Sequence, residues 1–323
     1  MNDQGALMSK YPYWDTIGLD QIHDSGQWNL HPFLAQTDQD HLLDSLLQSG
    51  MLHPPVVQVC SNGYELLSGR RRLYTLKQAL GQTRCCCQIL SPDTPVLTLL
   101  HLILTDQESA GPLSPMEQAW FLACCGRHME PSAIIERFLP RLGRRAHRTQ
   151  LDTQLHLLEL PPLLQHHIHE GVIDETIGLE LLHLGPDEQI FFAGLFTALG
   201  MGRGKQKRLL ALSRDLAGRN GCRIGELFAD EESREILAGQ AMNPPQTTNR
   251  LLELLQRRCL PRSTEAELAF KKRLTSLDLP SDWQIAHCPA FEKDSVSLTI
   301  PFPDLDHCAQ QLPALIQLLK RET

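Results

Sequence analysis

Three consecutive arginines follow a glycine in the stretch SGRRRLYTLKQALG, residues 68–81. The stretch reads as a helix that starts at Gly69 and carries Arg70, Arg71 and Arg72 in its first turn. The first turn of a helix has unpaired N–H groups and the positive end of the peptide dipole. Added guanidinium charge there predicts an anion site, and nucleotide phosphate is the leading candidate.

Two other clusters of reactive side chains indicate less specific chemistry. Cys85, Cys86 and Cys87 are consecutive, and neighbouring residues of a strand point to opposite faces, so the three thiols cannot converge on one metal ion. We interpret them as a buried strand of small apolar side chains and the ten cysteines as reduced thiols, because paired spacing is absent. The histidines of LLQHHIHEG predict a solvated helix face.

The first hundred residues alternate between helix and strand signals. Residues 18–33 read as a short strand followed by a loop, and residues 37–50 as a helix that Gly50 ends. The strands VVQV and YELLS flank Asn62-Gly63, which tolerates the positive φ angles of a tight hairpin turn. After the arginine helix, RCCCQIL supplies another strand. We therefore expect a mixed α and β domain.

The order of these elements resembles the N-terminal domain shared by ParB-type partition proteins and sulfiredoxin-like proteins. ParB members bind CTP and carry a glycine-glutamate-arginine-arginine phosphate motif; Gly69, Arg71 and Arg72 match it, and Arg70 replaces its glutamate. The resemblance implies that Arg70 still helps to hold the phosphates. Another part of the nucleoside site is implied by the loop residues that match here, Gly50 and Pro54.

The resemblance continues into LSPMEQA, residues 113–119. Just upstream, ParB proteins carry a glutamate-asparagine pair and an arginine that hold phosphate and magnesium, where this chain has Asp106, Gln107 and Ala110. A carboxylate is a magnesium ligand, so Asp106 is the candidate for Mg²⁺. Ala110 offers nothing to a phosphate, so we expect at most weak CTP hydrolysis.

A basic segment follows at residues 130–162. A short amphipathic helix, a glycine-bearing break and a second helix give the outline of a helix-turn-helix, and five arginines fall within twelve residues. This density predicts contact with DNA phosphate, although a solvated charge run is the alternative. We expect Thr149 and Gln150 to reach base edges. The phosphate contacts are assigned to Arg144, Arg145 and Arg148.

A second basic cluster, Lys205, Lys207 and Arg208, stands at a later helix start. It suits phosphate, and an ordinary solubilising helix end explains it equally well. Residues 221–262 contain Pro-Pro and polar stretches, which predict a linker with short helices. The last sixty residues predict a helix, two strands and a second helix. A part of this size is too small to bury the apolar faces of its own sheet and helices, so we expect two copies to associate as a homodimer.

We therefore expect an α+β, mostly helical chain with four parts. They are a ParB/sulfiredoxin-like α/β nucleotide-binding domain (1–105), an all-α DNA-binding domain with a helix-turn-helix (106–220), a linker (221–262) and an α-β-β-α dimerisation domain (263–323). The N-terminus lacks a signal peptide and no long apolar run is present, which predicts a cytoplasmic protein without membrane contact.

The predicted function is a ParB-like, CTP-responsive dimeric clamp on double-stranded DNA, in plasmid or chromosome partition or in transcription regulation. A ParA-like ATPase is the implied partner in partition. Two alternatives stay open. One is a degenerate interaction module without nucleotide, consistent with the net charge of -8. The other is a nucleotide-dependent phosphotransfer enzyme with Asp106 or Glu65 as its base.

Overall fold

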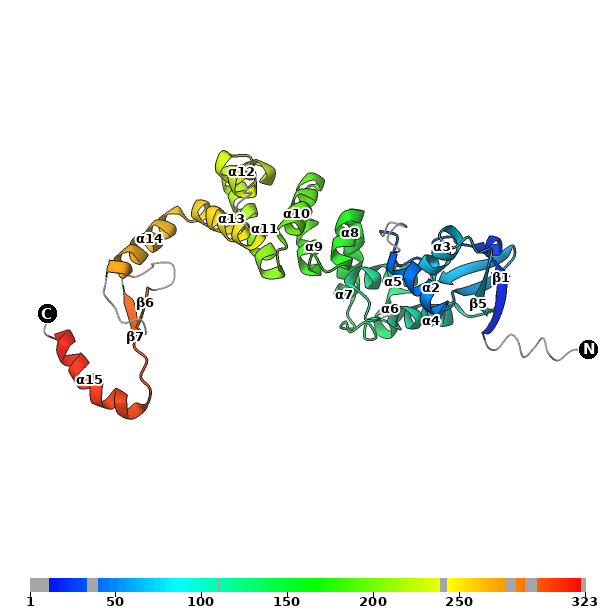
Figure 1. The fold of residues 1–323 in the computed structure, drawn as a ribbon, viewed down its shortest axis with the longest axis horizontal. Coiled ribbons are helices and arrows are strands. Elements are labelled where there is room, and N and C mark those ends of the chain that lie inside the picture. The colour runs from blue at the N-terminus through cyan, green and yellow to red at the C-terminus, as the bar shows by residue number, and fades with distance from the viewer. Residues whose placement is uncertain are drawn as a thin grey trace, which may run out of the picture. The chain divides into compact units, whose positions relative to one another are not determined.

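The computed structural model describes residues 12–33, 40–109, 111–238, 243–276, 283–287 and 295–320. The chain divides into two compact units, Met1–Lys207 with Asn243–Pro245 and Arg208–Met242 with Gln246–Thr323. The expected mixture of helices and strands is confirmed (Figure 1). None of the described helices combines the length and the apolar character needed to cross a membrane.

A five-stranded sheet forms one end of the first unit, with strand order β1-β5-β3-β4-β2. Its strands are β1 (Tyr13–Gly18), β2 (Ile22–His23), β3 (Val56–Cys60), β4 (Gly63–Ser68) and β5 (Arg84–Leu90). The predicted hairpin is confirmed as the antiparallel pair β3–β4. Gly63 has a φ of 126°, which a residue with a Cβ rarely adopts, so the Asn-Gly signal has the expected physical basis.

The strand prediction for the cysteine triplet is confirmed, with one correction. Cys85 and Cys87 are buried, whereas Cys86 points to the other face of β5 and is exposed. The alternation of a strand therefore separates the thiols as expected. Among the residues that the structure describes, no group of three or more metal-ligating side chains is arranged to hold an ion.

The helices of the first unit either lie between strands of the sheet or follow it along the chain. They are α2 (Asp40–Ser49), α3 (Arg70–Gln78), α4 (Val96–Glu108), α5 (Pro115–Gly126), α6 (Pro131–Arg137), α7 (Arg148–His156), α8 (Pro162–His169), α9 (Glu175–Leu181), α10 (Pro186–Leu199) and the start of α11 (Arg203–Asn220). Helix α3 is the predicted arginine helix, and α6 and α7 are the two helices predicted for the basic segment. The 3-10 turns are η1 (Leu19–Gln21), η2 (Leu157–Glu159) and η3 (Ile224–Phe228).

One apolar core runs through the predicted boundary at residue 105. Helix α4 crosses that position without a break, and its buried Leu100 and Leu104 belong to the same cluster as Phe121 and Phe138. The Phe121 and Phe138 rings meet edge to face at 5.2 Å. The sheet and the helices α4 to α7 therefore share one core within the first unit.

The segment predicted as a linker, residues 221–262, is instead built of packed helices, which corrects that prediction. It contains η3, α12 (Glu231–Ala238) and α13 (Pro244–Cys259). Leu251 and Leu255 of α13 are fully buried, and Ile224 and Phe228 of η3 are buried too. Pro-Pro stands at the start of α13, where the missing N–H group removes no helical hydrogen bond, so it marks a helix start here.

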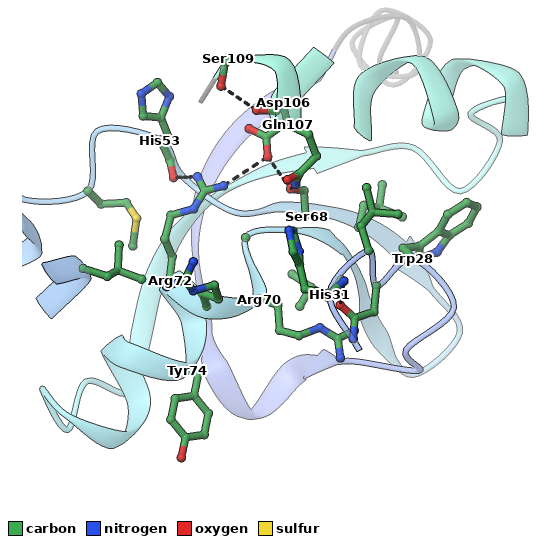
Figure 2. Close-up of a pocket in the computed structure, with 18 of the residues that line it drawn as sticks. Trp28, His31, His53, Ser68, Arg70, Arg72, Tyr74, Asp106, Gln107 and Ser109 are labelled. Carbon is green, nitrogen blue, oxygen red and sulfur yellow. Dashed lines mark hydrogen bonds and ion pairs between the residues drawn. The ribbon is translucent and has the colours of Figure 1, made fainter. Parts of the chain in front are cut away.

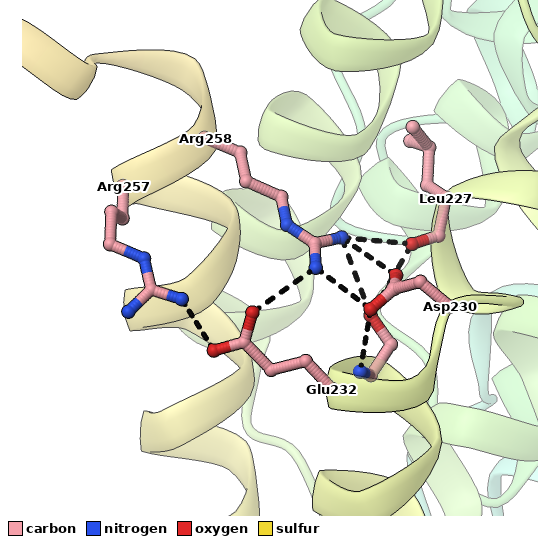
Figure 3. Close-up of polar contacts among 6 residues, drawn as sticks. Leu227, Asp230, Glu232, Arg257 and Arg258 are labelled. Atoms are coloured by element: carbon pink, nitrogen blue, oxygen red, sulfur yellow. Dashed lines mark hydrogen bonds and ion pairs between the residues drawn. The ribbon is translucent and has the colours of Figure 1, made fainter.

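The Arg258 side chain on α13 forms hydrogen bonds with residues at the start of α12 (Figure 3). Its two terminal nitrogens donate to the Asp230 carboxylate, each at 2.8 Å, and one of them donates to the Leu227 carbonyl at 3.2 Å. These hydrogen bonds hold the pKa of Asp230 well below its usual value. Asp230 also accepts hydrogen bonds from the N–H and hydroxyl groups of Ser233, so one carboxylate caps α12 and binds α13.

The C-terminal part of the second unit contains a helix, two strands and a helix in the expected order. These are α14 (Pro261–Ser276), β6 (Gln284–His287), β7 (Val296–Thr299) and α15 (Leu305–Lys320), and the strands pair antiparallel. Every residue of β7 is exposed, including Val296 at 60% and Leu298 at 43%.

We predict that Arg258→Ala lowers the free energy of unfolding of the second unit by about 1–2 kcal/mol, because it leaves Asp230 without its charged partner. Urea unfolding followed by circular dichroism measures the change. The matched control is Arg257→Ala, which removes an exposed arginine that binds only Glu232 among the described residues. Equal stability of the two variants would contradict this assignment.

Candidate functional site

A cavity of about 610 Å³ opens where α2 ends, α3 begins and α4 ends (Figure 2). Most of the residues predicted for a nucleotide line it, although they come from distant parts of the chain. These are Gly50, Gly69, Arg70, Arg71, Arg72 and Asp106. Pro54 does not line the cavity, and its neighbours Leu52 and His53 do. Small-molecule sites are typically of this size, so the cavity has room for a nucleotide.

Gly69 shapes the end of the cavity at the start of α3. Its φ of 93° lies in the left-handed region, and a Cβ there would meet the Pro55 Cα at 2.9 Å. Glycine is therefore required both by the backbone angle and by the close approach of Pro55. Because Gly69 has no side chain, no side-chain cap covers the start of α3. The start of α3 also carries the positive end of the peptide dipole, which favours a negative charge there.

Arg70 and Arg72 contact carboxylates of the protein. Arg70 forms an ion pair with Asp24. Arg72 donates to the His53 carbonyl and to Asp106, the latter at 3.2 Å. Arg71 also lines the cavity. The three arginines therefore line one cavity, and ion pairs within the protein neutralise part of their positive charge.

Asp106 lies at the centre of a small polar network at the end of α4 (Figure 2). Its carboxylate accepts a hydrogen bond from the Ser68 hydroxyl in addition to the one from Arg72. Gln107 donates to the Ser68 hydroxyl at 3.3 Å. Ala110, the other substituted position, lies outside the described residues. The network holds the Asp106 carboxylate next to Arg72 at the wall of the cavity.

Glu117 and His31 form another part of the wall. The Glu117 carboxylate contacts the His31 ring at 2.6 Å and accepts from the Ser114 N–H at 2.7 Å. Burial alone would raise the pKa of Glu117, but these hydrogen bonds outweigh burial and lower it to about 2. Glu117 also closes a capping box with Ser114 at the start of α5, so it is both a helix cap and a wall of the cavity.

His169 corrects the prediction of a solvated histidine face on α8. Its ring contacts the Ser114 hydroxyl at 2.8 Å and lies 5.2 Å from the Phe33 ring. Burial, opposed by the nearby Glu117 charge, lowers the pKa of His169. The ring is thus part of the packing between α5 and α8.

Sequence reasoning missed several residues of the cavity, among them Trp28, His31, Met51, Tyr74 and Glu117. Trp28 and His31 lie in a segment without helix or strand, so no spacing of apolar residues in the sequence could place them at the cavity. Trp28 is buried and stacks on the His128 ring at 5.0 Å. Glu117 could have been placed at a helix start from the sequence, because a serine followed by a glutamate three residues later is typical of a capping box.

Among the predicted DNA-contacting residues, Arg144 has a structural task. It donates both terminal nitrogens to the Glu175 carboxylate at 2.7 Å each, and its Nε donates to the Gln118 side chain at 2.9 Å. Its side chain is only 18% exposed. The pair connects the α6–α7 turn to α5 and α9. A phosphate contact by Arg144 stays a prediction, and in this structure its charge is already satisfied.

The other residues predicted on α7 are more accessible. Arg145 and Thr149 are exposed, and Gln150 is half-buried. Arg148 pairs with Asp152 at 2.9 Å on the same helix, with 61% of its side chain exposed. His147 caps α7 by accepting from the Thr149 N–H. These side chains therefore gather around an accessible helix start.

Lys205, Lys207 and Arg208 all lie in the first two turns of α11. Lys207 and Arg208 are exposed, and Lys205 is half-buried. Arg208 donates to the Gln256 side chain. Both interpretations of this cluster, phosphate contact and an ordinary helix end, remain predictions.

Two bacterial proteins are each similar to about half of the chain, and no family model matches it. The stage 0 sporulation protein J of Bacillus subtilis is 30% identical over 144 residues, 44% of this chain and 48% of that protein. The chromosome-partitioning protein Spo0J of Thermus thermophilus is 27% identical over 157 residues, 49% and 55% of the two chains.

The chain is similar to chromosome-partitioning proteins of the Spo0J/ParB kind. It spans about half the length of the curated relatives it matches. A solved structure of C-terminally truncated ParB from Caulobacter crescentus, complexed with CTP-γ-S, aligns with 57% of this chain and 99% of its own at 15% identity. The TM-score of that alignment is 0.27, too low to support an argument about the fold.

The structure offers little support for Glu65 as a catalytic base. The Glu65 carboxylate accepts hydrogen bonds from the N–H and hydroxyl groups of Ser25 and does not line the cavity. Asp106, the other proposed base, accepts from Ser68 and Arg72. A general base must reach the proton that it removes. Of the two proposed bases, Asp106 lines the cavity and Glu65 does not.

We predict that Glu117→Gln lowers the free energy of unfolding of this ParB-like chain by on the order of 2 kcal/mol at pH 7. The carboxylate has a pKa lowered from 4.5 to about 2, so its contribution is present above pH 4.5 and lost as the pH falls toward 2. Glutamine keeps the capping box. Denaturant unfolding between pH 7 and pH 2 measures the difference.

The stability difference should shrink as the pH falls from 4.5 toward 2, and the two proteins should converge only below pH 2, because a carboxyl group is half protonated at a pH equal to its pKa. Glu170→Gln is the control, since it removes an exposed carboxylate of the same unit. A constant difference between wild type and Glu117→Gln at all these pH values would rule out the charge of Glu117 as the cause.

Proposed function

We propose that the chain is a ParB-like DNA-binding protein of chromosome or plasmid partition, whose N-terminal cavity binds CTP. The observation that carries the proposal is the convergence of Gly69, three arginines and Asp106 on one cavity. The names of its two relatives concern sporulation and chromosome partitioning. In this proposal nucleotide binding brings two N-terminal units together and closes a dimeric clamp on double-stranded DNA.

The cavity fits the parts of a nucleotide at different places. The open start of α3 and the guanidinium groups suit phosphate oxygens. Apolar and aromatic side chains that line the same cavity, Trp28, Leu46 and Met51, suit a nucleoside. The preference for cytosine comes from the resemblance to ParB, and the arrangement of these residues supports nucleotide binding as a class.

Magnesium fits the cavity only together with phosphate. Mg²⁺ in nucleotide sites is usually held by one or two carboxylates and by phosphate oxygens. Asp106 supplies one carboxylate beside the arginines. When bound, the ion would neutralise phosphate charge, while Ser68 and Arg72 orient the Asp106 side chain. The ion would thus join Asp106 to the phosphates.

The helices around α7 supply the proposed DNA contact. Arg145 and Arg148 are accessible beside the exposed Thr149, which supports phosphate contact by the arginines next to a base contact. The Arg144–Glu175 pair fixes the turn before α7. That pair therefore supports the orientation of α7, which in a helix-turn-helix is the recognition helix.

Two copies of the chain would cover the exposed apolar side chains of its C-terminal part. Val296 and Leu298 of β7 and Leu312 and Ile316 of α15 are 43% to 60% exposed. A two-stranded sheet gains stability by burying such a face. We propose a homodimer through this part, with a ParA-like ATPase as the partner in partition. A role in transcription regulation remains the runner-up.

We predict saturable binding of CTP in the presence of Mg²⁺, and at least a tenfold loss of affinity in Arg72→Ala, because a charge-assisted phosphate contact is removed. Isothermal titration calorimetry measures the affinity, with ATP, GTP and UTP as competitors for base preference. Arg84→Ala is the matched control, because Arg84 is exposed in the same unit and donates only to the Thr16 carbonyl among the described residues.

The absence of saturable CTP binding up to millimolar concentration, with or without DNA, would overturn the nucleotide part of the proposal. DNA binding without nucleotide would then leave a simpler DNA-binding dimer. Turnover of CTP that disappears in Asp106→Asn would instead favour the phosphotransfer enzyme.

We predict that retention on duplex DNA weakens with salt, and that Arg145→Ala/Arg148→Ala reduces the slope of log affinity against log salt by about two, since each phosphate contact releases about one counterion. Fluorescence anisotropy with a labelled duplex measures it. Arg84→Ala should keep the wild-type slope. A salt-independent interaction, or an unchanged slope in the double variant, would favour the interaction module.

A further inference from the structure

We propose that Asp24 is the built-in counter-ion of Arg70 and sets both the affinity of the cavity for phosphate and its preference among ligands of different charge. This inference rests on the proposed nucleotide site and adds a residue to it. Asp24 does not itself line the cavity, whereas Arg70 does. Asp24 therefore acts on the ligand through Arg70, as a residue that determines specificity.

Asp24 is held in place by contacts that do not involve Arg70. Its Oδ1 accepts a hydrogen bond from the Gly26 N–H at 3.1 Å. The next residue, Ser25, donates its N–H and hydroxyl groups to Glu65 on β4. Just before Asp24, β2 pairs with β4 and places His23 beside Glu65. The carboxylate is thus fixed to the sheet, where it meets a cation from α3.

Arg70 is bound to this carboxylate through one nitrogen. The contact joins its Nη2 to Asp24 Oδ1, and a guanidinium group has five N–H donors. The remaining donors can therefore serve a ligand while the ion pair persists. The side chains of Arg70 and Asp24 are 32% and 31% exposed. A pair this accessible to solvent is weak enough for a phosphate to compete with it.

The other carboxylate of the site behaves differently. Asp106 lines the cavity and contacts Arg72 directly, so it lies where it can meet the ligand or a cation. Asp24 lies behind Arg70 and can offer the ligand only repulsion. Its negative charge reduces the attraction that Arg70 exerts on a phosphate, and this reduction grows with the charge of the ligand.

The Asp24 carboxylate therefore makes the affinity of the cavity for phosphate lower than Arg70 alone would give. Replacing the Asp24 carboxylate by a neutral amide of the same size leaves the geometry intact and frees the full charge of Arg70. We expect Asp24→Asn to bind CTP about three- to tenfold more tightly than wild type in Mg²⁺. The gain should be smaller for CDP and smallest for CMP, because these carry fewer negative charges.

The test is calorimetric titration of CTP, CDP and CMP into the full-length wild type, Asp24→Asn, Arg70→Ala and the double variant, at low and high salt. In the Arg70→Ala background the gain from Asp24→Asn should disappear, because Asp24 acts through Arg70. The gain should also shrink in high salt, since the two side chains are partly exposed. Circular dichroism confirms folding of each variant.

Asp152→Asn is the matched control, because it removes an aspartate that pairs with an exposed arginine on α7, away from the cavity. It should leave CTP affinity unchanged. If wild type binds CTP and Asp24→Asn binds it equally or more weakly, the inference is overturned and the proposed function stands. A gain that persists without Arg70 also overturns it. If no variant and no wild-type protein binds CTP, the proposed nucleotide site itself fails, and this inference with it.

Discussion

The close approach of Gly69 to Pro55 is the constraint on which the cavity depends. At that point the chain leaves β4, takes a left-handed backbone angle and enters α3 within a single residue. Any side chain at Gly69 would have to displace Pro55, and with it the loop after α2. Gly69 and the three arginines after it line the cavity together with Asp106, so this close approach is part of the cavity itself.

Carboxylates of the protein form ion pairs with arginines at the cavity and in the basic segment, residues 130–162. Arg70 contacts Asp24, Arg72 contacts Asp106, Arg141 contacts Glu108 and Arg144 contacts Glu175. The net charge of -8 and the presence of arginine clusters are therefore compatible. An ion pair that is partly exposed is worth little in stability, so it can exchange its anion at small cost. The Arg144–Glu175 pair differs from the other three because two parallel hydrogen bonds fix its geometry.

The sequence was informative where a local signal has one structural meaning. Asn62-Gly63 predicted a hairpin and the arginine stretch predicted a helix start, and both are confirmed. Pro-Pro at residues 244–245 was misread, because proline breaks a helix interior but is accommodated at a helix start. The ion pairs of Arg70 and Arg144 could not be read from the sequence, since their partners lie 46 and 31 residues away. Only the folded chain brings such residues together.

Glu117 explains why the predicted division at residue 105 does not describe the physical organisation of the first unit. Its carboxylate caps α5 through Ser114 and contacts His31 on the cavity wall. Ser114 in turn contacts His169 at the end of α8. A displacement of His31 would remove a partner from a carboxylate whose burial makes an unpaired charge costly. The cavity wall and the helices after it are therefore coupled through buried polar groups as well as through their shared apolar core.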